Sequence, residues 1–218
     1  HDRFNNANGA VYFDGVDDYI NTFTTYDLQE RTVSFWFYAM RTSGINALIA
    51  HDANNLSYGA FSANIENGDL RARAGGTPTY SIQMPIAAHT WHHLTLVRRT
   101  DSVFFYLNGN FILKGPSNSN GSAFQAYNKL VIGAHRSRSQ DFFKGRMDDL
   151  KIFNCAFDQS QVDSLFQDTT GITISPCTQG YWPFEGNIRD TSGYGNHGTF
   201  HGAPQLTLDR NGNPNGAY

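Results

Sequence analysis

Short segments of alternating apolar and polar residues, separated by turn signals, run through almost the whole chain. Residues 58–76 (YGAFSANIENGDLRARAGG) alternate on both sides of Asn67–Gly68, the residue pair that most favours a tight hairpin turn. Residues 90–115 contain two more such strands around Thr100–Asp101 and a second turn at Asn108–Gly109. Strands at this spacing, with almost no helical periodicity, predict an all-β fold of two packed antiparallel sheets.

Four other segments are predicted strands: residues 10–22, 31–40, 128–135 and 145–154. The segment 31–40 (RTVSFWFYAM) is apolar on both faces, which predicts a central strand. One stretch departs from the β pattern, residues 158–168 (DQSQVDSLFQD). Asp158 and Gln161 fit a capping box, and the apolar stripe that follows predicts a short helix that covers the core.

The composition argues against several classes of protein. Only 16% of the residues are charged and the net charge is −3, so we expect no nucleic-acid partner. No run of residues approaches the ~18 apolar positions of a membrane-spanning helix, so we expect no membrane insertion. The acidic residues are 16 Asp and only 3 Glu, and Asp concentrated in loops suits calcium better than a solvated helical surface.

Cys155 and Cys177 are the only cysteines. They flank a loop-like stretch and do not form a C-x-x-C pair, which argues against a metal or redox role. We predict a disulfide between them, with two unpaired thiols as the alternative. A disulfide implies an oxidising, extracytoplasmic setting. No signal peptide is visible, so we expect a mature protein or an excised fragment.

The two ends of the chain are similar to each other. Residues 2–10 read DRFNNANGA and residues 209–217 read DRNGNPNGA, an offset of 209 − 2 = 207 residues. Self-similarity at a fixed offset is typical of tandem modules. We therefore expect one period of a repetitive protein, cut out of phase with its domain boundary.

Five motifs follow one another along the chain: GAVYFDGVDDYI, RTVSFWFYA, WHHLTLVRRTDSVFFYLNG, KLVIGAH and GRMDDLKIFNCAFDQSQVDSLFQ. In this order they resemble the laminin G-like, concanavalin A-like jelly-roll modules. The block YWPFEGNIRDTSGYGNHGT looks like the opening block of that family, yet it stands near the C-terminus. The resemblance implies a two-sheet antiparallel jelly-roll sandwich with permuted boundaries: a body at residues 1–168, a linker at 169–179 and the opening strands at 180–218.

A body without its opening strands would expose a core groove and an unpaired strand edge. Residues 180–218 are therefore expected to fold back into that groove, to insert into a neighbouring copy, or to begin the next repeat. The sequence leaves these three arrangements open.

The resemblance also implies a structural calcium ion, because similar family members often hold one between the segments that correspond here to DTSGYGN and RMDDLKIF. Calcium takes about six to eight oxygen ligands, and the candidates are Asp190, Asn196 and Asp148. Strand alternation places Asp148 on the core side and Asp149 outside, and a carboxylate on the core side needs a cation or a hydrogen-bond cluster. An Asx-turn at Asp190 and a solvated Asp148 are the alternative.

A second acidic cluster, Asp14, Asp17 and Asp18, lies in a predicted turn. The turn explains these residues better than a metal site does.

Polar loops offer candidate sugar-binding residues. Sugar sites combine an aromatic platform with amide and guanidinium groups, and the loops supply Asn55, Tyr58, Tyr80, Arg136 and Arg138. Nothing in the sequence shows that these residues converge, and polar loops on a secreted sandwich are the alternative.

Catalysis is not expected. The fold implied by the resemblance also hosts glucanases, whose retaining members need two carboxylates about 5–5.5 Å apart. Glu30, Glu66 and Glu185 lie in three separate segments, and none of the common catalytic motifs appears.

The sequence therefore predicts a non-catalytic, extracellular or cell-surface module for adhesion or carbohydrate binding, stiffened by calcium and one disulfide. Its expected partners are a glycan or another cell-surface ligand, and neighbouring copies of the same module. The alternative is a purely structural repeat that forms fibres or stalks by strand complementation between copies.

Overall fold

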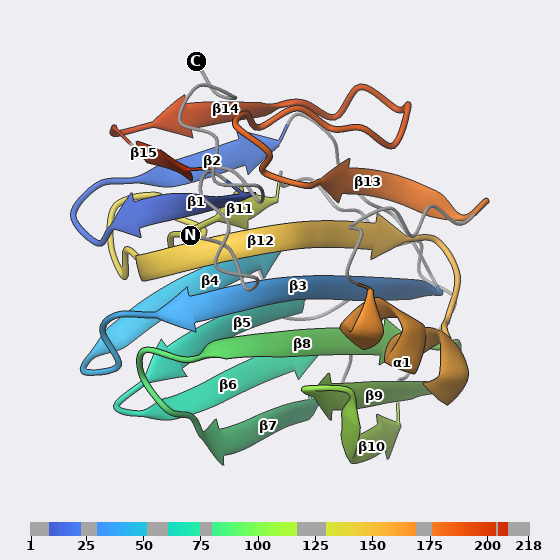
Figure 1. The fold of residues 1–218 in the computed structure, drawn as a ribbon. Coiled ribbons are helices and arrows are strands. Elements are labelled where there is room, and N and C mark those ends of the chain that lie inside the picture. Colours follow the sequence, from blue (N-terminus) through green and yellow to red (C-terminus); the bar gives the residue numbers. More distant parts are fainter. Residues whose placement is uncertain are drawn as a thin grey trace.

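The computed structural model describes residues 9–22, 30–51, 61–74, 80–116, 130–168, 176–203 and 205–208. Within these residues the chain forms fifteen strands in two antiparallel sheets and one helix (Figure 1). The predicted all-β sandwich is confirmed.

The larger sheet has the strand order β10-β9-β8-β3-β12-β1-β15, and β13 also pairs with β12. Its strands are β1 (Gly9–Asp14), β3 (Arg31–Ala39), β8 (Trp91–Arg98), β9 (Ser102–Leu107), β10 (Asn110–Pro116), β12 (Lys144–Phe153), β13 (Thr178–Trp182) and β15 (Gln205–Leu208). Strand β3 lies between β8 and β12, and its Val33, Phe35 and Phe37 are fully buried in the core. The sequence-based prediction of a central strand at 31–40 is therefore confirmed.

The smaller sheet has the strand order β14-β2-β11-β4-β5-β6-β7. Its strands are β2 (Tyr19–Thr22), β4 (Ile45–His51), β5 (Phe61–Glu66), β6 (Asp69–Ala74), β7 (Tyr80–Pro85), β11 (Val131–Ile132) and β14 (Gly198–His201). The hairpin β5–β6 turns at Asn67–Gly68, where φ is 52° and 92°. Positive φ at both central residues is what a type I′ hairpin turn requires, so this predicted turn is confirmed.

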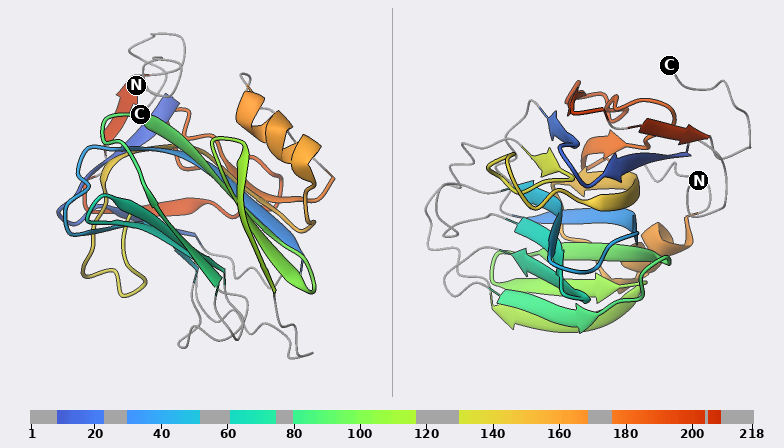
Figure 2. Two further views of the ribbon diagram at one scale, coloured as in Figure 1. Left: turned by 90° about the horizontal axis from the view of Figure 1, so that it is seen from below. Right: turned by 90° about the vertical axis from the view of Figure 1, so that its left-hand side faces the viewer.

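The helix α1 (Gln159–Gln167) lies on the outer face of the larger sheet, and the smaller sheet lies behind that sheet (Figures 1 and 2). Its N-terminus carries the predicted capping box, in which Asp158 accepts a hydrogen bond from Gln161 N. Val162 and Leu165 are buried in a second apolar cluster, separate from the core between the sheets. The helix therefore covers the outer face of the larger sheet.

The last strands of the described chain complete both sheets at one edge of the sandwich (Figures 1 and 2). Strand β13 pairs with β12, β14 pairs with β2, and β15 pairs with β1. Trp182 and Phe184 from this segment are fully buried in the core. In this single chain the described part of residues 180–218 thus folds back onto its own body, and residues 209–218 lie outside the described residues.

Cys155 and Cys177 form the predicted disulfide, with their Cα atoms 5.9 Å apart. The bond joins the chain just after β12 to the residue that precedes β13. It therefore ties the body of the sandwich to the segment that closes it.

Candidate functional site

A groove of about 280 Å³ opens on the outer face of the smaller sheet. Its floor and one side come from β4, β5 and β6, and the other side comes from the loop 133–143 between β11 and β12. The groove therefore lies on the opposite side of the molecule from α1.

Strand alternation on β5 gives the groove its polar side. Phe61, Ala63 and Ile65 point into the core, whereas Ser62, Asn64 and Glu66 are partly exposed on the outer face. Successive residues of a strand point to opposite faces, so these three polar side chains form one row.

Small side chains on the neighbouring strand make the hollow. Ala47 lies opposite Asn64 and Ala50 lies opposite Ser62 in the β4–β5 pairing. A methyl group fills little of the space above the sheet, so the polar row on β5 borders a depression rather than a flat surface.

The loop 133–143 forms the opposite wall and is fixed to β4 by backbone hydrogen bonds. Ala47 N donates to Asp141 O at 2.8 Å, and Gly133 N donates to Leu48 O at 2.8 Å. Arg138 and Asp141 have positive φ values of 62° and 58°. Non-glycine residues adopt this region only when their surroundings hold them there, and such residues cluster at binding sites.

Several polar side chains in the groove make no hydrogen bond or ion pair with other described residues. Arg71, beside the groove, forms an ion pair with Glu66 at 2.9 Å. Among the described residues, by contrast, the side chains of Ser62, Asn64 and Arg73 make no hydrogen bond or ion pair. They are partly exposed and can serve a ligand without breaking an internal contact.

The ring of His135 contributes an N–H donor, and a contact with Ser137 determines which ring nitrogen carries the proton. Ser137 N donates to His135 Nδ1 at 3.2 Å. In the neutral imidazole the proton therefore resides on Nε2, because one ring nitrogen accepts while the other donates. The groove wall thus offers an N–H group in addition to the amide, hydroxyl and guanidinium groups.

The predicted sugar-binding residues separate in the structure. Arg136 lines the groove, whereas Arg138 Nε donates to Asn21 Oδ1 at 2.9 Å and anchors the loop to β2. Tyr80 begins β7, but its side chain lies outside the described parts of the chain, as do Asn55 and Tyr58. Their role in sugar binding stays a prediction.

Asp190, a predicted calcium ligand, is the centre of a hydrogen-bond cluster. Its Oδ1 accepts from Tyr181 N and Ser192 N, each at 2.9 Å. Its Oδ2 accepts from Ser192 Oγ at 2.8 Å and from Asn196 N at 2.9 Å. Four donors thus engage both oxygens of this buried carboxylate, and the Asn196 amide donates in turn to Gln179 O at 2.8 Å. This donor set fits hydrogen bonding to Asp190 better than it fits a cation.

The structure brings Asp190 and Asn196 together but does not bring Asp148 to them. Tyr181 N, which donates to Asp190, points away from β12, so Asp190 lies on the far side of β13 from the strand that carries Asp148. Calcium binding by these three residues stays a prediction.

The expected orientation of Asp148 was wrong, because β12 contains a bulge. The register with β3 shifts between Asp148 and Lys151, and Asp149 has a φ of 48°. Met147 and Leu150 consequently both face the core although they are three residues apart. One extra residue reverses the alternation beyond it, and a bulge of this kind leaves no clear mark in the sequence.

Both aspartates of the bulge are buried on the helix-covered side. Asp148 pairs with Trp36, whose ring stacks on Phe166 of α1 at 5.4 Å between centroids. Asp149 is 3% exposed and accepts a hydrogen bond from Tyr181 Oη at 3.0 Å.

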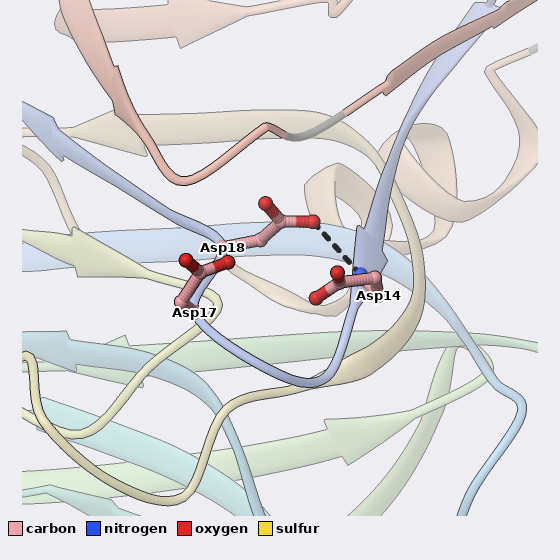
Figure 3. A group of neighbouring side chains, drawn as sticks. All are labelled: Asp14, Asp17 and Asp18. Atoms are coloured by element: carbon pink, nitrogen blue, oxygen red, sulfur yellow. Dashed lines mark hydrogen bonds between the residues drawn. The ribbon is translucent and has the colours of Figure 1, made fainter.

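The acidic cluster Asp14, Asp17 and Asp18 occupies the turn between β1 and β2 (Figure 3). Asp14 Oδ1 accepts from Val16 N at 2.7 Å, which is the predicted turn geometry. Asp18 is 1% exposed, and its two oxygens accept from Asp14 N at 2.9 Å and Ala203 N at 2.8 Å. Burial raises the pKa of Asp18 above its usual value of 3.8, although both hydrogen bonds oppose this shift.

One ligand atom from each of these three carboxylates lies within 4.8 Å of the others, so the cluster could hold a metal ion. Asp17 is exposed, and Asp14 and Asp18 keep unused lone pairs. The donor set is therefore compatible with a hard cation such as calcium.

Comparison with known families decides the identity of this sandwich. A laminin G-type model, described as the concanavalin A-like lectin/glucanases superfamily, matches residues 14–163. The chain belongs to this superfamily. No curated protein sequence matches the chain significantly.

Solved structures share the superfamily fold at low sequence identity. A protein from Bacteroides ovatus, provisionally assigned as carbohydrate-binding, has a TM-score of 0.67 and 18% identity over 94% of this chain, which spans 61% of that protein. A heptameric SAP-like pentraxin from Limulus polyphemus has a TM-score of 0.66 and 15% identity, covering 95% of this chain and 97% of the pentraxin.

A carbohydrate-binding domain of a Ruminococcus gnavus sialidase, bound to α2,3-sialyllactose, is a more distant relative. It has a TM-score of 0.51 and 13% identity, covering 72% of this chain and 96% of that domain. At these identities the three likenesses establish the fold alone.

The sequence alone did not identify Ser62, Asn64 and Arg73 as candidate binding residues. Alternation around the Asn67–Gly68 turn already places all three on one face of a hairpin, so that signal was available. The sequence does not reveal which face of the hairpin is hollow, because the hollow depends on the alanines of β4 and on the loop 133–143.

Among the described residues, no helix is long and apolar enough to cross a membrane.

Proposed function

We propose that the chain is a non-catalytic carbohydrate-binding module of an extracellular or cell-surface protein, and that it binds sugar in the groove of the smaller sheet. The observation that carries this proposal is the row Ser62–Asn64 beside the alanine floor, with Arg73 and Arg136 around it. Hydroxyl, amide and guanidinium groups at the rim of a concave surface are the groups that bind sugar hydroxyls. The superfamily and the carbohydrate-binding structural relatives support the same function.

The arrangement of the glutamates supports a binding role rather than hydrolysis. Glu66 lines the groove and its carboxylate engages Arg71. Glu30 stands just before β3, and Glu185 follows β13. The three glutamates therefore lie in separate parts of the fold, and retaining hydrolysis needs two carboxyl groups about 5–5.5 Å apart.

An extracellular location fits the Cys155–Cys177 disulfide, because disulfides persist in oxidising compartments. A structural calcium ion is part of the same proposal. The cluster of Asp14, Asp17 and Asp18 supports it better than Asp190 does, since both oxygens of Asp190 already accept hydrogen bonds.

A glycan-array screen followed by calorimetry of the best ligand tests the function. We expect Asn64→Ala to weaken binding about tenfold, because a ligand hydrogen bond inside a groove contributes about 0.5–1.5 kcal/mol and the amide can make more than one. Asn110→Ala is the matched control, since Asn110 is exposed at the start of β10 in the other sheet. A module that binds no glycan, or that binds one equally well after Asn64→Ala, would contradict the proposed site.

A further inference from the structure

Four side chains of fixed charge line the groove: Arg73, Arg136, Glu66 and Asp141. Glu66 is already neutralised by Arg71, at 2.9 Å just outside the lining. Of the two arginines, Arg136 already takes part in another interaction. Arg73 is therefore the arginine whose charge a ligand can use.

Arg73 has no acid beside it on the sheet. In the register of β5, β6 and β7 it lies between Ser62 and Ser81. Among the described residues it takes part in no hydrogen bond or ion pair, and its side chain is partly buried. A guanidinium group presents paired N–H donors that match a carboxylate or sulfate, and such charge-assisted bonds are about twice as strong as neutral ones.

The groups next to Arg73 suit hydroxyls. Ser62 and Asn64 can each donate and accept, and His135 offers its Nε2 proton. The described lining contains no phenyl, phenol or indole ring, so this part of the groove offers no such face on which a nucleotide base could stack. A ligand that fits both features carries many hydroxyls and a negative charge.

We infer that the groove binds an acidic sugar whose anionic group pairs with Arg73. This inference rests on the proposed carbohydrate-binding function and adds the class of sugar. A uronic or sialic acid would supply a carboxylate, and a sulfated sugar would supply a sulfate. Both present oxygens that a guanidinium group can bind through two parallel hydrogen bonds.

Isothermal titration calorimetry on matched pairs of glycans tests the inference. The probes are α2,3-sialyllactose against lactose, a trigalacturonate against its methyl ester, and a sulfated disaccharide against its unsulfated form. We expect at least one acidic member to bind about tenfold or more tighter than its neutral partner, and its affinity to fall as salt is raised. The pair that shows the preference identifies the anionic group.

Two variants connect this preference to the groove. Arg73→Gln should remove most of the difference between the acidic and neutral partners, whereas Arg73→Lys should keep part of it because the charge remains. Arg99→Gln is the control, since Arg99 is exposed and its guanidinium lies over Phe104, away from the groove. Melting curves of all variants check that the fold is intact.

The outcomes separate this inference from the proposed function. Neutral sugars that bind as well as acidic ones, with binding lost in Asn64→Ala and unchanged in Arg73→Gln, would overturn the acidic-sugar inference and keep the proposed function. An acidic preference that survives Arg73→Gln would also overturn it. No binding by any glycan would overturn both.

Discussion

At the residue scale, two buried carboxylates hold segments of the chain in place through hydrogen bonds. Asp190 collects four hydrogen bonds in the closing segment, and Asp18 bridges the β1–β2 turn to Ala203. The sequence selected Asp190 as a calcium ligand, and that role stays a prediction. The sequence could not name the partners, because three of the four donors are backbone N–H groups whose positions only the folded chain defines.

The cluster around Asp190 predicts a large loss of stability on substitution. Asp190→Ala should lower the free energy of unfolding by about 3 kcal/mol, because the buried N–H groups of Tyr181 and Asn196 lose their acceptor at a cost of about 1–3 kcal/mol each. Chemical denaturation measures this change. Asp17→Asn, an exposed carboxylate, is the control; with all proteins measured in excess chelator, so that no ion contributes, it should stay within about 0.5 kcal/mol of the wild type. Equal stabilities of the two variants would contradict this role.

The same two variants test the proposed calcium ion. A chelator should lower the melting temperature of the wild-type protein, because an ion bound only to the native state stabilises it. If the ion lies at the acidic cluster, Asp17→Asn removes this sensitivity and Asp190→Ala retains it. The reverse pattern would place the ion at Asp190 as the sequence predicted, and a melting curve unchanged by excess chelator would exclude a structural ion.

Asp18 predicts a specific pH dependence of stability. Burial raises the pKa of Asp18 above 3.8 in the folded chain, so the native state holds this proton more tightly than the unfolded state does. The contribution of Asp18 to the free energy of unfolding is therefore fully present below 3.8 and is lost as the pH rises through the raised pKa.

Denaturation curves of the wild type and Asp18→Asn, recorded from about pH 3 to pH 7, measure that contribution. The stability of the wild type relative to the variant should decrease as the pH rises. A difference that instead grows with pH would show that the hydrogen bonds from Asp14 N and Ala203 N dominate over burial.

At the element scale, local patterns predicted most strands and the helix. The Asn67–Gly68 and Asn108–Gly109 turns have positive φ at both positions, and the capping box at Asp158 is present. These features depend on residues close together in sequence. The bulge at Asp149 arises because β12 must bend to pair with β3 on one side and with both β1 and β13 on the other. These pairings join residues far apart in sequence, so no local sequence pattern predicts the bulge.

Removing the disulfide should weaken the closure of the sandwich. Cys155 and Cys177 are 22 residues apart, and cross-linking a loop of this length stabilises a fold by about 3 kcal/mol in the chain-entropy model. We expect the double variant Cys155→Ser with Cys177→Ser to lose about that much free energy of unfolding. A mild reductant should have the same effect on the wild type and none on the double variant. A loss below about 0.5 kcal/mol would show that the loop is ordered without the bond.

At the scale of the whole molecule, the sequence predicted the sandwich and the need to close it, but left the mode of closure open. In the structure β13, β14 and β15 pair with strands of the same chain. The sequence could not decide this, because exchange between copies would use the same side chains and the same register. The groove belongs to the same scale, since it arises only where β4, β5, β6 and the loop 133–143 meet.

Closure within one chain predicts a monomer. Light scattering coupled to size exclusion should give a mass near 24.3 kDa over a wide range of concentrations, because all three closing strands already have partners. Dimers or longer chains that separate only under unfolding conditions would instead support strand exchange, and with it the fibre or stalk function considered from the sequence.

The position of the closing strands also governs how the protein is made. Translation proceeds from the N-terminus, so β12 leaves the ribosome well before Trp182 and Phe184 exist to cover the core beside it. Until residue 208 has been synthesised, the nascent chain displays an apolar surface and open strand edges on both sheets. Such a surface is a natural target for chaperones and a risk for aggregation, and the sandwich reaches its native packing only after β13, β14 and β15 have left the ribosome.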